Sequence, residues 1–116
     1  MWNSQNAVAY ADTIQTLAEA ATITMDANLW STWEVTLTAN RIMGLPTNLT
    51  PGATYQIKVT QDGTWGHTLT YAAGWVLSVN PLRLNTWANE ETIISFKVFS
   101  NWKPYAVSAV DFTEVI

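Results

Sequence analysis

The stretch Tyr-Gln-Ile-Lys-Val-Thr at residues 55–60 decides the fold class of this 116-residue chain. Apolar Tyr55, Ile57 and Val59 alternate with polar neighbours, so they fall on one face of an extended strand. Aromatic and β-branched side chains dominate the run, as is typical of a half-buried strand. We therefore expect a β-strand here, with its three apolar side chains facing a core.

The same period of two recurs on both sides of this stretch. Alternating runs lie at residues 22–25, 34–39, 67–71 and 92–99, and turn-forming pairs such as Asp62-Gly63 separate them. Short strands without intervening helices are typical of an antiparallel sandwich. We expect an all-β fold: a single antiparallel β-sandwich, jelly-roll-like, over residues 13–116, preceded by an extended N-terminal arm, residues 1–12.

Two segments are less regular. In residues 7–21, Tyr10, Ile14 and Leu17 have helical spacing, yet residues 13–17 also alternate as a strand would. Periodicity alone cannot decide between helix and strand here, so both stay open. Residues 76–86 are apolar without a clear period, and we expect a loop with a short strand.

Composition limits the classes of partner. Five basic and nine acidic residues give a net charge of −4, with no cluster of either sign. Binding along a phosphate backbone needs concentrated Lys and Arg, so we expect no nucleic-acid partner. No apolar run approaches the ~18 residues of a membrane span, and the N-terminus lacks the pattern of a signal peptide. We expect no membrane partner.

No constellation of catalytic residues is visible. His67 is the single histidine and Cys is absent, so a thiolate metal site and a thiol nucleophile are excluded. Glu90 and Glu91 are neighbours in a predicted strand and therefore point to opposite faces. His67 follows Gly66 at a predicted strand start, where we expect a capping or cross-strand role. We predict no enzyme activity, no catalytic residue, no cofactor and no metal.

Tryptophan is the unusual signal, because seven indoles are more than one small core needs. Trp65 lies in a predicted turn, and Trp30 and Trp33 bracket a predicted loop. Aromatic side chains anchor many interfaces and can also stack on sugar rings, although some of these indoles will close the ends of the sandwich. The predicted interface and binding residues are Trp2, Tyr10, Trp30, Trp33, Trp65 and Trp102.

Several motifs, in this order, resemble a β-sandwich module of tailed-bacteriophage virion proteins. They are Ala-Thr-Ile-Thr-Met-Asp at residues 21–26, Val-Thr-Leu-Thr-Ala-Asn-Arg at 35–41, a Pro-Gly turn at 51–52, Gln-Asp-Gly at 61–63, Gly-His-Thr-Leu-Thr at 66–70 and the acidic strand entry at 84–92. The resemblance covers residues 14–100, with departures at Trp65 and residues 101–104. It implies a structural or binding part of a virion, often homotrimeric, and not an enzyme.

Three functions remain open. The first is a capsid decoration (cement) protein that bridges major capsid subunits, with residues 1–12 and the Trp loops as anchors. The short chain without a fibre shaft favours this interpretation. The second is a tail-fibre or tail-spike tip that binds a host surface glycan through exposed indoles. The third is a carbohydrate-binding module of a cellular protein. In the first two the expected partners are further copies of the chain, as a homotrimer, and other virion proteins.

Overall fold

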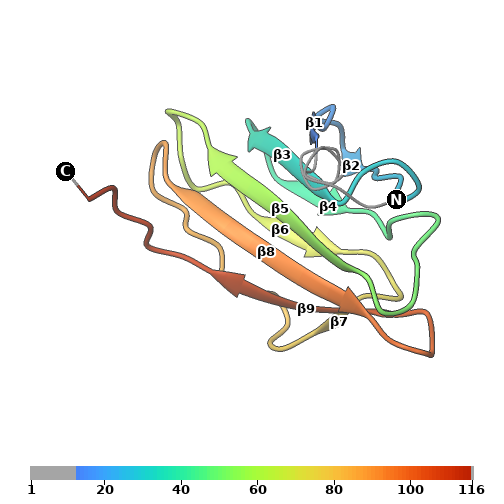
Figure 1. The fold of residues 1–116 in the computed structure, drawn as a ribbon. Coiled ribbons are helices and arrows are strands. Elements are labelled where there is room, and N and C mark those ends of the chain that lie inside the picture. The colour runs from blue at the N-terminus through green and yellow to red at the C-terminus, as the bar shows by residue number, and fades with distance from the viewer. Residues whose placement is uncertain (1–12, 116) are drawn as a thin grey trace.

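The computed structural model describes residues 13–115, and that range contains nine strands in two sheets and no helix (Figure 1). The larger sheet has the order β1-β3-β5-β8-β9-β7, and the smaller has the order β2-β4-β6. The strand bounds are β1 Ile14–Thr16, β2 Thr22–Ile23, β3 Thr32–Leu37, β4 Arg41–Met43, β5 Thr54–Gln61, β6 Leu69–Tyr71, β7 Val76–Leu77, β8 Glu91–Val98 and β9 Pro104–Ala109. The all-β prediction is confirmed.

The prediction of an antiparallel sandwich is wrong in strand direction. Between the described strands, only β5–β8 and β8–β9 pair antiparallel. The pairs β1–β3, β3–β5, β2–β4, β4–β6 and β7–β9 are parallel. The cause is the path of the chain, which crosses to the opposite sheet after each of the first six strands. Each strand of one sheet therefore serves as the crossover that parallel neighbours in the other sheet require. This strand order does not confirm a jelly roll.

Residues 13–21 adopt no helix, and Ile14–Thr16 forms the edge strand of the larger sheet. Of the two structures left open for residues 7–21, the described part thus contains a short strand and no helix. The predicted arm, residues 1–12, lies outside the described residues. The expected short strand within residues 76–86 is β7.

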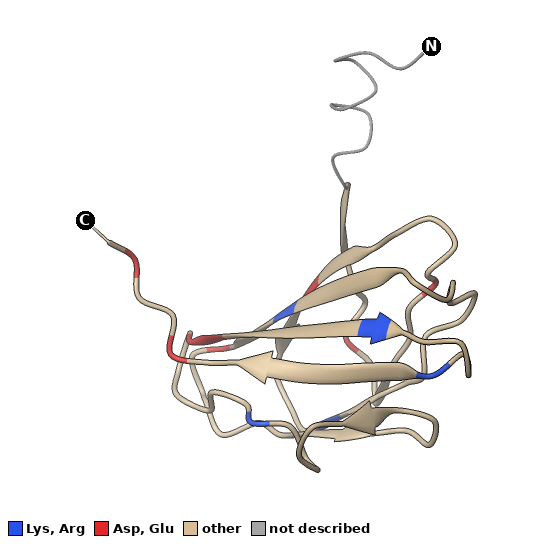
Figure 2. Cartoon of the chain, turned by 60° about the horizontal axis from the view of Figure 1, so that its bottom comes forward, with Lys and Arg blue, Asp and Glu red and all other residues tan. Residues whose placement is uncertain are grey.

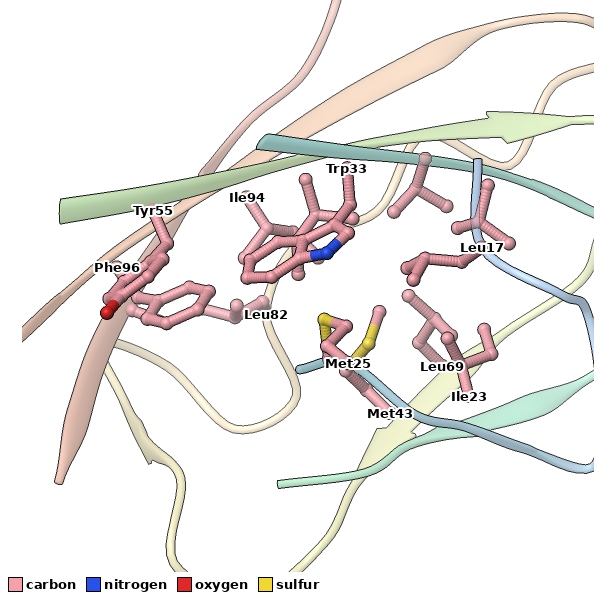
Figure 3. Packing of buried hydrophobic residues seen from close by; sticks show 14 of the residues in the cluster. Leu17, Ile23, Met25, Trp33, Met43, Tyr55, Leu69, Leu82, Ile94 and Phe96 are labelled. Carbon is pink, nitrogen blue, oxygen red and sulfur yellow. The ribbon is translucent and has the colours of Figure 1, made fainter. Parts of the chain in front are cut away.

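The core lies between the two sheets (Figure 3). Ile23, Met43 and Leu69 of the smaller sheet face Trp33 and Ile94 of the larger sheet, and all five side chains are buried. Inward positions alternate with outward ones along β3, β5 and β8, as the period of two requires. In the described part of the chain no buried side-chain nitrogen or oxygen lacks a hydrogen-bond partner. Both sheets thus contribute to one continuous core.

The long strands give the larger sheet two distinct ends. At the end that we call the platform end, β5 finishes and β8 begins, and the Gln61 N–H donates to the Glu90 carbonyl. At the opposite end, the hairpin end, a tight connection joins β8 to β9 (Figure 1). Strand β1 begins toward the hairpin end, because Ile14 pairs with Thr32 at the start of β3. Over the described residues, no helix is long and apolar enough to cross a membrane.

Candidate functional site: an indole pair on braced loops

Two exposed indoles meet at the platform end. The rings of Trp65 and Trp87 have centroids 5.8 Å apart and planes inclined by 25°, an offset stack. Their side chains remain 55% and 69% exposed. Large apolar side chains that stay this open are candidates for contact with a ligand or partner. We call these two residues the indole platform.

A network centred on Asp62 shapes the loop that carries Trp65. The Asp62 Oδ1 atom accepts the backbone N–H of Thr64 at 2.9 Å and the Thr64 hydroxyl at 2.5 Å. The Nε2 atom of His67 lies 2.9 Å from the same oxygen. The hydrogen bonds from Thr64, and then that from His67, lower the pKa of Asp62 to about 2. The carboxylate is therefore ionised at neutral pH and closes the turn around Thr64.

Gln61 fastens the same loop to the core. Its buried side chain donates from Nε2 to the His67 carbonyl at 2.8 Å, and its Oε1 accepts the His67 N–H at 3.1 Å. This pair of bonds satisfies the amide in both directions. The Gln61 side chain thus holds the His67 backbone in the loop before β6, while the His67 ring faces Asp62.

The loop that carries Trp87 is tied directly to the Trp65 loop. The Gly66 N–H donates to the Thr86 carbonyl at 2.8 Å, and the Asn89 N–H donates to the Asp62 carbonyl at 3.1 Å. Within the second loop, the Trp87 N–H donates to Asn85 Oδ1 at 3.2 Å. The ring spacing is therefore set by backbone bonds between the loops and not only by contact between the indoles. Such preorganisation reduces the entropy lost on binding.

The backbone of Trp65 is strained, and burial of its side chain does not offset the cost of this strain. Its φ is 50°, in the left-handed region that costs a non-glycine L-residue about 1–2 kcal/mol. Asn or Gly would relieve that strain, and an exposed Trp gains little from the hydrophobic effect in return. A bulky residue held in this conformation is an outlier that points to a function for its side chain.

Asp62 sets a pH dependence for this loop. Its pKa is about 2 in the folded chain and 3.8 without these contacts. A carboxylate with a lowered folded pKa stabilises the fold above the unfolded pKa, and this contribution disappears as the pH falls from about 4 to about 2.

We predict that Asp62→Asn flattens the dependence of the unfolding free energy on pH between 4 and 2. Urea unfolding across that interval measures it, with Trp fluorescence reporting on the indole platform. Equal slopes for the variant and the wild type would show that the Asp62 contacts do not form in solution.

Trp102 occupies a different exposed cluster, at the hairpin end. It is 64% exposed with φ of 64°, and its N–H donates to the Phe99 carbonyl at 2.9 Å. The Phe99 ring packs edge-on to Tyr105 with centroids 5.0 Å apart, and Lys97 Nζ lies 6.0 Å from the Phe99 centroid. Because β8 separates the two ends, Trp102 does not belong to the indole platform.

The remaining predicted site residues that the structure describes do not join the platform. Trp30 is half-buried and packs against the core at the hairpin end. Trp2 and Tyr10 lie outside the described residues. Of the four predicted residues that lie within the described range, only Trp65 belongs to the platform.

The assignment of Trp33 as a surface anchor is wrong, because the side chain is completely buried. The sequence predicted a loop before Glu34, but β3 already begins at Thr32. Trp33 therefore shares the inward parity of Val35 and Leu37. Its ring stacks on Tyr55 and Phe96, and its Nε1 donates to Gln15 Oε1 at 3.0 Å.

Trp87 is the platform residue that the sequence analysis missed. It follows Asn85 and Thr86 and precedes Asn89 and Glu90, so it is a large apolar residue within a polar loop. The same signal singled out Trp65. The contact between the two could not be read from the sequence, because it depends on how the two loops cross.

The polar groups beside the platform form a structural brace. Asp62, Thr64 and His67 combine a carboxylate, a hydroxyl and an imidazole, and they contact one another: the Thr64 hydroxyl donates to Asp62 Oδ1 and lies 3.0 Å from His67 Nε2. Within residues 13–115, no three His, Cys, Asp or Glu side chains are grouped so that they could hold a metal ion. What the platform can offer is a pair of fixed apolar ring faces beside hydrogen-bonding groups, which suits stacking against a flat ligand.

A family model with the description "Putative phage tail fibre C-terminal domain" matches residues 24–99. The matched range begins after β2, contains β3 to β8, and includes both residues of the indole platform. No curated protein and no solved structure matches the chain.

Proposed function

Because the chain belongs to the family of phage tail fibre C-terminal domains, we propose that it is the receptor-binding tip of a tail fibre. In this proposal it binds a saccharide on the host surface through the indole platform and catalyses no reaction. It acts in the assembled virion, as a homotrimer.

The observation that carries this proposal is the indole platform itself. Trp65 and Trp87 are exposed, stacked and held by bonds between two loops. A saccharide ring presents a face of C–H groups that packs well on an indole, while nearby polar groups bond its hydroxyls. The strained backbone of Trp65 supports a role in binding, because the fold alone would favour Asn or Gly there.

The orientation of the domain agrees with a position at a tip. Strand β1 starts toward the hairpin end and runs toward the platform end, since it is parallel to β3. The chain therefore enters its first strand from the side away from the indole platform. A fibre that joined the domain there would leave Trp65 and Trp87 facing outward.

The family match favours a tail location over capsid decoration, the function that the short chain favoured at first. The predicted capsid anchors included residues 1–12 and the Trp loops. Of these, Trp33 is buried, and residues 1–12 lie outside the described part of the chain. The exposed Trp65 loop would suit either interpretation, so the preference for the tail fibre comes from the family match.

Location in the virion tests this proposal. We predict that gold-labelled antibody raised against the purified chain decorates the distal ends of tail fibres in electron micrographs. Serum depleted on the purified chain is the matched control and should leave particles unlabelled. Label distributed over the capsid shell would overturn the proposal in favour of decoration.

A further inference from the structure

Acidic groups surround the indole platform. Asp62 and Glu90 lie in the two platform loops, Glu91 begins β8, and Asp111 and Glu114 follow β9. Figure 2 shows acidic segments gathered at this end, near the C-terminal tail. The surroundings of Trp65 and Trp87 are therefore richer in negative charge than the rest of the sheet.

The basic side chains nearest this end already face carboxylates. Lys58 Nζ lies 3.1 Å from Glu34 and 3.3 Å from Glu91, and both contacts raise the pKa of Lys58. Arg41 Nε is 2.9 Å from Glu19 Oε2. Arg83 lies 4.0 Å from Asp111. Among the described residues, each Lys or Arg at this end lies within 4.0 Å of a carboxylate, although the Arg83 and Asp111 side chains stay 75% and 77% exposed.

The hairpin end has the opposite character. Lys97 and Lys103 lie there, and neither forms an ion pair with another described residue. Basic segments mark this end of β8 and the following hairpin in Figure 2. The domain is thus polarised along its strands, with its exposed indole pair at the negative end.

From this polarity we infer that the indole platform selects uncharged saccharides and rejects acidic ones. The inference rests on the proposed function and specifies the class of its ligand. Like charges brought together at a binding surface lower both the affinity and the association rate. A uronic or phosphorylated sugar stacked on Trp65 and Trp87 would meet the carboxylates of Glu90 and its acidic neighbours, which outnumber the basic side chains at this end. A neutral hexose would instead donate hydroxyl protons to those carboxylates.

Glu90 is the residue that allows a sharp test. Its N–H donates to the Trp87 carbonyl at 3.2 Å, so it lies directly beside the platform. Its side chain forms no ion pair with another described residue, and its carbonyl accepts from Gln61 through the backbone alone. A change in its charge should therefore alter ligand preference with little effect on the loop.

The experiment compares a panel of matched oligosaccharides, each neutral hexose oligomer paired with its uronic-acid counterpart of the same linkage and length. Calorimetric titration of the full chain at low salt is expected to give binding to neutral members and at least about tenfold weaker binding to uronates. The difference should narrow as salt rises, because exposed charges are screened. Glu90→Lys should strengthen uronate binding, and Glu90→Gln is the uncharged control.

The outcomes separate the two claims. Uronates that bind as tightly as their neutral partners, or more tightly, would overturn the inference and leave the proposed function standing. Binding to no member of the panel would overturn the proposed function itself. Selective binding that persists when Trp65 and Trp87 are both Ala would also overturn the inference, because another surface would then select the sugar.

Discussion

Replacing Trp65 and Trp87 together by Ala is expected to weaken binding to the host-surface saccharide on the order of 1,000-fold, while the domain stays folded. Exposed aromatic residues at the centre of a binding surface commonly contribute about 2 kcal/mol each, and each 1.4 kcal/mol is tenfold in affinity. The stability should change little, because the two side chains are 55% and 69% exposed and bury little surface. Their mutual stacking is worth only about 0.5–1.5 kcal/mol.

Matched variants separate loss of the rings from damage to the fold. Leu29→Ala removes another exposed apolar side chain, 75% exposed and in the loop before β3, and should leave binding unchanged. Trp65→Asn keeps a residue that tolerates a positive φ and should be at least as stable as Trp65→Ala. Titration with the saccharide and thermal unfolding measure the two effects. A double variant that binds like the wild type would show that the indole platform does not bind the saccharide.

The second large effect is expected in the core. Trp33→Ala should lower the unfolding free energy by about 3–5 kcal/mol, the usual cost of truncating a buried aromatic residue. Trp33 packs against both Tyr55 and Phe96, with centroid distances of 5.8 and 6.4 Å. Its removal would leave a cavity between the sheets and deprive Gln15 of its indole donor. Since most domains are stable by only about 5–15 kcal/mol, much of the stability would be lost.

Urea unfolding measures this loss. Trp33→Phe keeps a ring in the stack and should cost clearly less than Trp33→Ala. Trp102→Ala is the exposed control, because that side chain is 64% accessible and should cost under about 1 kcal/mol. Equal stabilities for Trp33→Ala and Trp102→Ala would mean that the two sheets do not pack around Trp33.

Alternation of apolar and polar residues predicted the longest strands well. The run at residues 55–60 lies within β5, and the run at 92–99 overlaps nearly all of β8. Alternation reports only that one face is buried, and it is the same for parallel and antiparallel neighbours. The crossing of the chain between the sheets depends on short connections such as residues 38–40, which carry no signal of direction. The parallel pairing of the strands could therefore not be predicted from the sequence.

Of the two residues of the indole platform, one could be predicted from the sequence. Trp65 stood out as a large apolar residue in a turn, and the structure leaves it exposed. Its partner Trp87 lies 22 positions later in the chain, and the two meet because backbone bonds join their loops. Trp33 was assigned to a loop because the strand was expected to start only at Glu34. Its spacing of two and four residues from Val35 and Leu37 already indicated that it faces the core with them. Position within a strand would have placed it correctly.

The proposal that this tail fibre domain is a receptor-binding tip is tested most directly by binding to receptive host cells. Purified, fluorescently labelled wild-type chain should bind these cells saturably, and the Trp65 and Trp87 double Ala variant should not bind above background. Wild-type chain that fails to bind cells to which the phage adsorbs would contradict the account, as would equal binding by the double variant.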